Sequence, residues 1–557
     1  MRHLTKAVLS TVAASSLLLA GCSAGASSNS SENSKQQLDV KPADFQKAEY
    51  DELKDGGTLN LSVGAFGEQM NVFSADATSA TTEIWSWYNP RIGLYDDEAK
   101  WYANPNYITK VQDEVVDGKT VVTWDIEPKA TFNDGTPVDW KTFEATWKAN
   151  NGSDSGFISG DTDGYKDIES VTMGKDPKQV VVTYKIKYPW WKKNFEFLLH
   201  PKAAADAKTF NEGYINTPHA EWGAGPYTLK SLDATAGTVV FEKNPNWWGK
   251  PGKLDEIVLK SLRDQAEMNA FKNNQLDMIG IATKDRFEQV QGMEVNRYTS
   301  VSRSLMLLQI NSKSENMSDI RVREAIFHAL DRPKLVEIRY NGLNYHENPP
   351  ASLLLRSFQD GYEDNLGDLG KFDAEKSKKL LDEAGWKLNG EYRQKDGKNL
   401  EIHIPQFSQN SNTQAFYGAM TAMFKSVGIK MVVDQRKPTE FASIMRNLEF
   451  DVVFSANIST NPFGMADVGQ VYKSDSTLSV TSLGNAEIDK MIEKSQYAPT
   501  EAESIKFGNE AEKKAMAQVG WMPLLSGPTM VATRKGLVNL GAMGYTVMPK
   551  NMIGWKK

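Results

Sequence analysis

Alternating apolar and polar positions mark the part of the chain that follows residue 57. In 58–63 (TLNLSV), leucine or valine occupies every second position, which is the pattern of a strand with one buried face. Asp117 and Gly118 lie between the two β-rich runs of 115–126, and this pair predicts a hairpin. Apolar residues at helical spacing predict helices at 140–149 and 267–274. The same reasoning predicts further strands at 180–186, 227–232, 238–243 and 257–262.

Helices and strands alternate after residue 304. The apolar run 305–310 (LMLLQI) predicts a buried strand that crosses between two parts of the protein, and 521–525 is a second such candidate. Ser318 is predicted to cap a helix with an apolar stripe. Pro333 is predicted to open another helix, and Asp373 to cap a third.

The most regular stretch lies between residues 400 and 456. Strand patterns at 400–404, 429–433 and 450–455 alternate with helical patterns at 416–427 and 439–447. This β-α-β-α-β order predicts a parallel sheet covered by helices, and ligands bind beyond the carboxyl ends of such strands. The loop that follows the last strand is therefore a candidate for ligand contact, although a surface loop without a role is the alternative. Its candidate residues are Asn457, Ile458, Ser459, Thr460, Asn461 and Phe463.

The N-terminal segment predicts export and attachment to a membrane. A basic start and an apolar run up to Ala20 have the layout of a secretory signal peptide. Residues 19–22 (LAGC) resemble a bacterial lipobox, in which the cysteine, here Cys22, is acylated; an ordinary signal peptide is the alternative. Residues 23–37 are rich in Ser and Asn, which predicts a flexible tether.

Composition excludes several functional classes. The formal net charge is −7 without long runs of one sign, so no basic stripe for nucleic acid is present. Cys22 is the single cysteine and there are six histidines, which argues against a zinc cluster and leaves no internal disulfide. We expect no metal and no cofactor. Catalytic signatures such as His-Glu-x-x-His, Gly-x-Ser-x-Gly and the Walker A loop are absent from the sequence, so we expect no enzyme.

Six short motifs in a fixed order carry a resemblance to a known family. They are 132–138 (FNDGTPV), 222–227 (WGAGPY), 244–248 (NPNWW), 319–326 (DIRVREAI), 379–385 (KLLDEAG) and 485–489 (NAEID). Together they resemble the family 5 extracellular solute-binding proteins of ABC importers, which include oligopeptide-, dipeptide- and nickel-binding lipoproteins. Each motif is weak alone, and it is their order between about 57 and 530 that is specific.

The resemblance implies an α/β, bilobed periplasmic-binding-protein-like fold of type II, cluster C. It also implies hinge crossings between the two lobes and an extra subdomain in the first lobe. The boundaries expected are 1–21 for the signal peptide, 22–55 for the linker, 56–80, 198–304 and 522–557 for the first lobe, 81–197 for the inserted subdomain, and 305–521 for the second lobe.

Ligand contacts are implied by approximate alignment with peptide-binding members. Ala77, Thr78 and Ser79 would supply a main-chain edge, and His200 and Arg446 match positions that line the cleft, where Arg446 could pair with a carboxylate. Trp85 is a further candidate, with a core position as its alternative. Peptide binders of this kind place an acid in the loop after the Phe-Asp-Val strand. This chain has Thr460 near that place and Asp467 as the nearest acid, which puts capture of a free amine in doubt.

The function expected is a lipid-anchored receptor that faces the extracellular side or the periplasm. It would capture oligopeptides or dipeptides as a monomer and deliver them to the permease of an ABC transporter. A non-peptide solute such as an oligosaccharide or a metal chelate is the alternative on the same scaffold. A surface-anchored hydrolase is an alternative from another class, because fold alone does not decide function.

Overall fold

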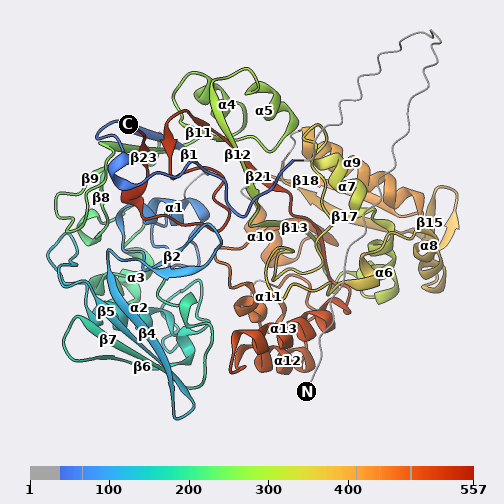
Figure 1. The fold of residues 1–557 in the computed structure, drawn as a ribbon. Coiled ribbons are helices and arrows are strands. Elements are labelled where there is room, and N and C mark those ends of the chain that lie inside the picture. Colours follow the sequence, from blue (N-terminus) through green and yellow to red (C-terminus); the bar gives the residue numbers. More distant parts are fainter. Residues whose placement is uncertain (1–37, 65–66, 409–410, 438–439, 477–478) are drawn as a thin grey trace, which may run out of the picture. The chain divides into compact units, whose positions relative to one another are not determined.

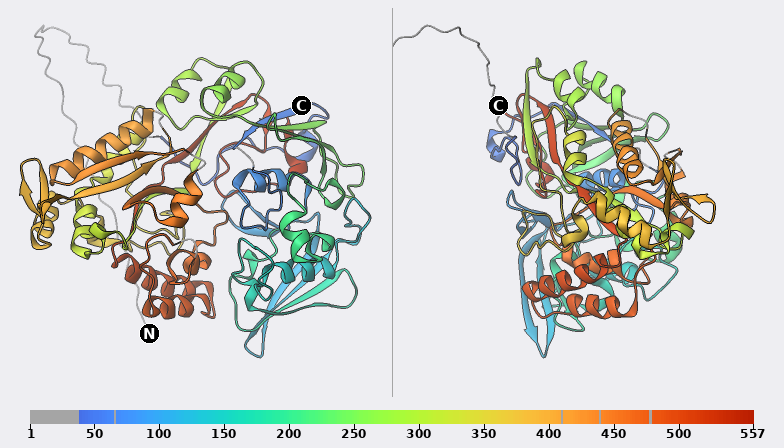
Figure 2. Two further views of the ribbon diagram at one scale, coloured as in Figure 1. Left: turned by 180° about the vertical axis from the view of Figure 1, so that it is seen from behind. Right: turned by 90° about the vertical axis from the view of Figure 1, so that its right-hand side faces the viewer.

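The computed structural model describes residues 38–64, 67–408, 411–437, 440–476 and 479–557 (Figures 1 and 2). The predicted signal peptide, Cys22 and the predicted linker up to residue 37 lie outside the described residues. In the described part of the chain, the strands form eight sheets of two to four strands each.

One four-stranded sheet is built from the first predicted strand and three later ones. β1 (Thr58–Val63) pairs in parallel with β10 (Glu256–Ser261), which pairs antiparallel with β9 (Thr238–Lys243), followed by β8 (Tyr227–Asp233). Leu59 and Leu61 are buried, as the alternation predicts. α1 (Ser79–Tyr88) packs on this sheet through Trp87, which stacks on Phe241. The four predicted strands are confirmed.

A second four-stranded sheet has the order β4-β5-β7-β6. β4 (Ile108–Val116) and β5 (Lys119–Ile126) are joined at Asp117 and Gly118, which both have positive φ, as a tight hairpin requires. The predicted hairpin is confirmed. The sheet is completed by β6 (Ile168–Met173) and β7 (Gln179–Tyr184), and α2 (Trp140–Asn150) contacts both of these strands.

Two three-stranded sheets are connected by the chain twice. β21 (Pro528–Arg534) lies between β11 (Met278–Gly280) and β12 (Val295–Val301) in one sheet. β13 (Ser304–Ile310) lies between β19 (Val452–Ile458) and β20 (Trp521–Leu525) in the other. We call residues 302–303, between β12 and β13, the first crossing, and residues 526–527, between β20 and β21, the second crossing (Figure 1).

The predicted parallel sheet of 400–456 is correct for two of its three strands. β17 (Glu401–Gln406) and β18 (Lys430–Gln435) pair in parallel, and α9 (Ser411–Ser426) connects them. β19 instead pairs antiparallel with β13. The physical reason is that β13 is buried along most of its length. It is therefore the central strand of its sheet, and the apolar β19 pairs with one of its edges. β17 touches β19 at its start, where the backbone N–H of Asp451 donates to the carbonyl oxygen of His403 at 3.1 Å.

Helix caps agree with prediction in one case and differ in another. Asp373 caps α8 (Ala374–Glu383), accepting from the backbone N–H of Lys376 at 2.8 Å, which confirms the prediction. The cap of α6 (Ile320–Ala329) is Asp319 rather than the predicted Ser318. Ser318 has helical backbone angles and its hydroxyl donates to the carbonyl oxygen of Glu315, so it cannot act as the cap.

Residues 38–55 are packed onto the described body, which differs from the predicted linker of 22–55. Lys41 forms a bridge with Ser300, and the backbone of Asp44 pairs with Ala542. Leu53 and Ala48 are buried in a small apolar cluster with Val538. These apolar residues give residues 38–55 buried surface that stabilises their packing on the body.

The remaining elements complete the molecule around these sheets. The helices are α3 (Ala207–Glu212), α4 (Asp264–Lys272), α5 (Lys284–Gln289), α7 (Arg332–Arg339), α10 (Phe441–Asn447), α11 (Val468–Tyr472), α12 (Ala486–Gln496) and α13 (Glu501–Met516). The strands are β2 (Gly93–Tyr95), β3 (Trp101–Ala103), β14 (Lys387–Asn389), β15 (Tyr392–Lys395), β16 (Lys398–Asn399), β22 (Leu537–Val538) and β23 (Gly554–Trp555).

Candidate functional site

Two pockets adjoin at the first crossing. The crossing pocket, of about 450 Å³, lies between the end of β1, the start of α1 and residues 540–553, with Arg303 in its lining. The loop pocket, of about 440 Å³, lies against β13, α10 and residues 455–460. The backbone N–H of Ser459, in the loop pocket, donates to the carbonyl oxygen of Arg303 at 3.0 Å, so the two linings touch.

The predicted loop contributes its first half to the loop pocket. Asn457, Ile458, Ser459 and Thr460 line it, and Ile458 is 55% exposed. Asn461 is buried and braces the loop from within, because its side-chain oxygen accepts from the backbone N–H of Phe463 at 2.9 Å. The sequence could identify this loop because it directly follows the apolar run that predicts β19.

Phe463 has a different place from its neighbours in the loop. Its ring packs edge-on to Tyr95 at 6.0 Å and against Trp190 at 6.1 Å, both in the predicted inserted subdomain of 81–197. Phe463 therefore joins residues far apart in the sequence and does not line either pocket.

Residues 77–79 form the start of a helix, not an open strand edge. Thr78 caps α1: its hydroxyl accepts from the backbone N–H of Thr81 at 3.2 Å, and its own N–H donates to the Thr81 hydroxyl at 3.1 Å. The N–H of Ala77 donates to the carbonyl oxygen of Ser74. The expected main-chain edge is thus already hydrogen-bonded at Ala77 and Thr78, and of the three residues Ser79 alone lines the crossing pocket.

Trp85 is a core residue. Its indole is 1% exposed and packs against Phe73, Tyr88 and Tyr214. Burial of so large a side chain stabilises the packing around α1 and leaves no face for a ligand. The structure therefore favours the core alternative over the ligand contact.

His200 is also buried, with 1% of its surface exposed. Its Nδ1 accepts from the backbone N–H of Lys202 at 3.1 Å, its Nε2 lies 3.4 Å from the carboxylate of Asp134, and its ring stacks on Trp222. Burial lowers the pKa of His200 from its ordinary value, although the Asp134 carboxylate opposes this. These contacts occupy both ring nitrogens and give His200 a structural place.

Arg446 lies exposed on α10 and lines neither pocket. Of the residues expected at the site, the structure thus brings together Ser79 in the crossing pocket and Asn457, Ile458, Ser459 and Thr460 in the loop pocket. The others are placed in the core, at the helix cap, in the contact with residues 81–197 or on the surface.

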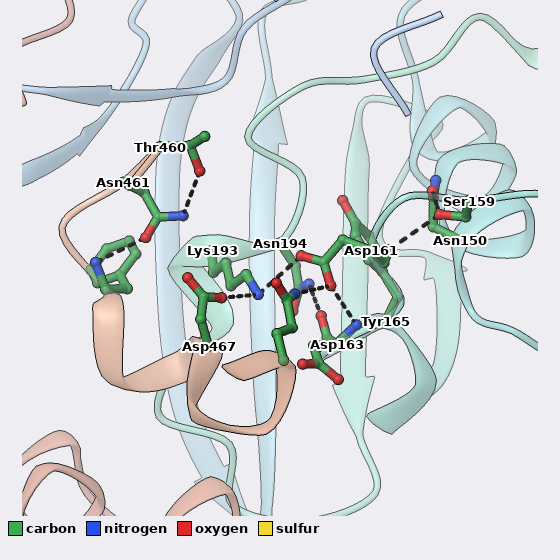
Figure 3. A network of polar contacts seen from close by, with 12 residues as sticks. Asn150, Ser159, Asp161, Asp163, Tyr165, Lys193, Asn194, Thr460, Asn461 and Asp467 are labelled. Carbon is green, nitrogen blue, oxygen red and sulfur yellow. Dashed lines mark hydrogen bonds and ion pairs between the residues drawn. The ribbon is translucent and has the colours of Figure 1, made fainter. Parts of the chain in front are cut away.

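A buried ion-pair network, which the sequence did not reveal, closes one side of the loop pocket. The Lys193 ammonium lies 2.7 Å from Asp467 and 3.0 Å from Asp161, and Figure 3 shows it between the two carboxylates. Gln470 also donates to Asp161 at 2.9 Å. Burial alone would lower the pKa of Lys193, but Asp467 and Asp161 outweigh it and raise that pKa well above its ordinary value.

Asp467 is the acid nearest to the loop in sequence, and this network engages it. Together with Gln470 it lines the loop pocket, so the pocket wall contains a carboxylate that already has a cationic partner. No pattern in the run Trp190-Trp191-Lys192-Lys193 distinguishes the buried Lys193 side chain from that of Lys192, which is partly exposed.

Over residues 38–64, 67–408, 411–437, 440–476 and 479–557, no group of three or more His, Cys, Asp or Glu is arranged to hold a metal ion. The same residues include no helix with the length and apolar character needed to span a bilayer.

Residues 97–478 match the family described as bacterial extracellular solute-binding proteins, family 5 Middle. The chain belongs to this family. Oligopeptide-binding protein OppA of Mycobacterium tuberculosis is 28% identical over 560 residues, which cover 97% of this chain and 92% of OppA.

Solved structures show the same fold. The periplasmic EDTA-binding protein EppA superimposes with a TM-score of 0.83 at 23% identity, covering 93% of this chain and 99% of EppA. The oligopeptide-binding protein AppA of Bacillus subtilis, in complex with a nonapeptide, gives 0.77 at 18% identity, covering 91% and 100%. The predicted family and fold class are therefore confirmed, and the chain is a solute-binding protein of the bacterial extracellular type.

Proposed function

We propose that the chain captures peptides in the crossing pocket and the loop pocket, as a monomer, and delivers them to an ABC permease. The observation that carries this proposal is the likeness to an oligopeptide-binding protein over nearly the whole chain, together with two adjoining pockets at the crossing between the lobes. The boundaries proposed for the lobes are those expected from the sequence, with the linker ending near residue 37.

The sheet edge at the loop pocket supports recognition of a peptide main chain. β19 is an outer strand of its sheet, so alternate N–H and C=O groups are directed away from β13. Among the described residues, β17 contacts this outer edge at its start, through Asp451, and no strand pairs with the rest of it. An extended peptide can add to such an edge, and the side chains then enter pockets on either side.

Calorimetry with alanine pentapeptide as the probe tests peptide capture. Thr460→Trp places an indole in the loop pocket and is expected to weaken binding strongly. Thr235→Trp, in the exposed turn between β8 and β9, is the matched control and is expected to bind as the parent chain does. Equal affinity in all three proteins would contradict the proposal, as would a single non-peptide mass in native mass spectrometry of protein from its own host.

We propose further that acylated Cys22 anchors the protein at the outer face of the membrane. More than one acyl chain is needed for stable attachment, and lipoprotein-type acylation supplies this. Cys22→Ser is expected to move the protein from the membrane fraction to the medium or the periplasm. Retention of the variant on membranes would contradict the anchor while leaving peptide capture untouched.

A further inference from the structure

Charges in the crossing pocket are paired with one exception. Arg91 pairs with Glu196, and the Lys550 ammonium lies 3.1 Å from Glu83. Arg303 forms no ion pair, and its guanidinium makes no hydrogen bond with any of the described residues. The carboxylates nearest to it, Glu83 and Glu196, are therefore already matched by other cations.

The position of Arg303 is fixed by its backbone, not by its side chain. Its carbonyl oxygen accepts from the backbone N–H of Ser459 at 3.0 Å and from the Arg356 guanidinium at 3.1 Å. The side chain of Arg303 remains accessible to solvent although protein surrounds it, and burial lowers its pKa. An arginine stays charged under such conditions. The result is a cation held at the junction of the two pockets and open to what enters them.

A second cation adds to the positive potential at this junction. Arg356 is buried, and its guanidinium donates to the carbonyl oxygens of Leu353 and Arg303, with no carboxylate partner in the residues that the structure describes. On the other side of the loop pocket, Asp467 shares the Lys193 ammonium with Asp161. At the junction of the two pockets, the charges without an opposite partner among the described residues, Arg303 and Arg356, are both cationic, which suits an anion.

We infer that Arg303 binds a carboxylate of the ligand, so that the solutes captured are carboxylate-bearing molecules. The inference rests on the proposed function, because it takes the two pockets as the ligand site. The planar guanidinium offers two parallel N–H donors that match the two oxygens of a carboxylate. In a peptide, the carboxylate is the C-terminus or an acidic side chain.

Calorimetry with matched probes distinguishes a C-terminal carboxylate from a side-chain carboxylate. The probes are alanine pentapeptide as the free acid, the same peptide as its C-terminal amide, the amide of Ala-Ala-Glu-Ala-Ala, and citrate as a non-peptide carboxylate. The parent chain is expected to bind the acid about 10- to 100-fold more tightly than the amide, since a hydrogen bond to a charged group contributes this much. If the amide of Ala-Ala-Glu-Ala-Ala binds as tightly as the free acid, a side-chain carboxylate is sufficient for binding at Arg303.

Variants of two arginines complete the experiment. Arg303→Gln is expected to remove the difference between acid and amide, and Arg303→Lys to keep part of it. Arg263→Gln, at an exposed residue before α4 that lines neither pocket, is the control and is expected to bind like the parent chain. Melting temperatures check folding, and Arg303→Gln is expected to melt no lower than the parent, because the lost cation has no partner.

The outcomes distinguish this inference from the proposed function. Equal binding of acid and amide by the parent chain, unchanged in Arg303→Gln, would overturn the inference and leave peptide capture intact. Binding of citrate that depends on Arg303, without binding of any peptide, would overturn peptide capture and support the inference. Absence of binding for every probe would overturn both.

Discussion

Glu512 is a buried carboxylate that organises the wall of the loop pocket. It is fully buried and accepts hydrogen bonds from the hydroxyls of Ser352 and Tyr472, the amide of Asn365 and the backbone N–H of Leu353 at 2.6–2.8 Å. Leu353 lines the loop pocket, so one side chain of α13 ties that wall to α11 and to the 352–365 segment.

Glu512→Ala is expected to lower the free energy of unfolding by about 3–5 kcal/mol, since it leaves several buried donors without an acceptor. Urea titration measures this. Glu487→Ala, an exposed residue paired with Lys514 on the surface, is the control and should change stability by less than about 1 kcal/mol. A similar small loss for both variants would show that the buried donors find water instead.

His200 and Asp134 predict a dependence of stability on pH. Burial, the largest influence, lowers the pKa of His200 below its unfolded value of 6.5, so the unfolded state binds the proton first as the pH falls. Burial would raise the pKa of Asp134, but Lys202, Thr136 and His200 together lower it below 3.8. Both groups therefore contribute stability that is lost on acidification, His200 below about pH 6.5 and Asp134 below about pH 4.

The test is urea unfolding of the parent chain and of His200→Gln between pH 5 and pH 7.5. The parent is expected to lose stability through this window, and the variant to lose less. Parallel curves for the two proteins would assign the pH dependence to other groups.

Residues of the core were more predictable from the sequence than residues of the site. His200 was a candidate by alignment and Trp85 a further candidate, but their burial depends on partners that are distant in the sequence. Trp85 packs against Tyr214, and His200 lies beside Asp134 and Trp222. Arg303 lies in a two-residue crossing, where no periodicity distinguishes it. Its importance comes from which carboxylates are already paired, and that is a property of the folded chain.

At the scale of elements, the second crossing is held in a conformation that requires glycine. Gly527 has φ +72, and a Cβ atom there would lie 1.7 Å from the Tyr340 hydroxyl. Glu347 accepts from the backbone N–H groups of Ser526 and Gly527 at 2.8 and 3.0 Å. Steric fit on one side and the half-buried Glu347 carboxylate on the other therefore fix the path between β20 and β21.

Gly527→Ala is expected to destabilise the protein by more than the roughly 1–3 kcal/mol that positive φ costs a residue with a side chain, because the clash with Tyr340 adds to that cost. Gly397→Ala is the matched control, with φ +76 and open space around the new methyl group. Urea unfolding of both variants isolates the clash, and adding Tyr340→Phe should recover part of it. Equal losses at the two glycines would mean that the crossing moves to accommodate the methyl group.

Strands and turns followed local patterns closely, whereas pairing between strands did not. The Asp117-Gly118 hairpin and the alternation of 58–63 depend on adjacent residues, so the sequence predicted them. The partner of β19 depends on where β13 lies, which adjacent residues do not encode, and the parallel pairing predicted for it was wrong.

At the scale of the whole molecule, residues 161–193 contact residues 463–504 through several polar and aromatic pairs. The Lys193 ammonium lies 2.7 Å from Asp467, and Trp190 donates its indole N–H to the buried Ser504 hydroxyl at 2.9 Å. Hinge motion in a two-lobed binding protein would have to break these contacts.

Lys193→Met is expected to shift the molecule toward an open form, because it leaves two carboxylates without their cation, at a cost of about 3–5 kcal/mol when such a pair is buried. Small-angle scattering should show a larger radius of gyration without ligand. Lys192→Met is the control, since Lys192 and Glu501 form a partly exposed pair at 3.4 Å that contributes about 1 kcal/mol or less. Identical scattering from both variants would show that the network does not govern opening.

The packed segment that begins at residue 38 has a mechanical consequence. The N–H of Leu38 donates to the carbonyl oxygen of Asn344, and Lys41 exchanges backbone hydrogen bonds with Thr299 and Val301, next to the first crossing. Tension applied through the preceding chain would therefore act close to the first crossing and exert little torque on either lobe. A pull on the N-terminal tether would then neither open nor close the protein.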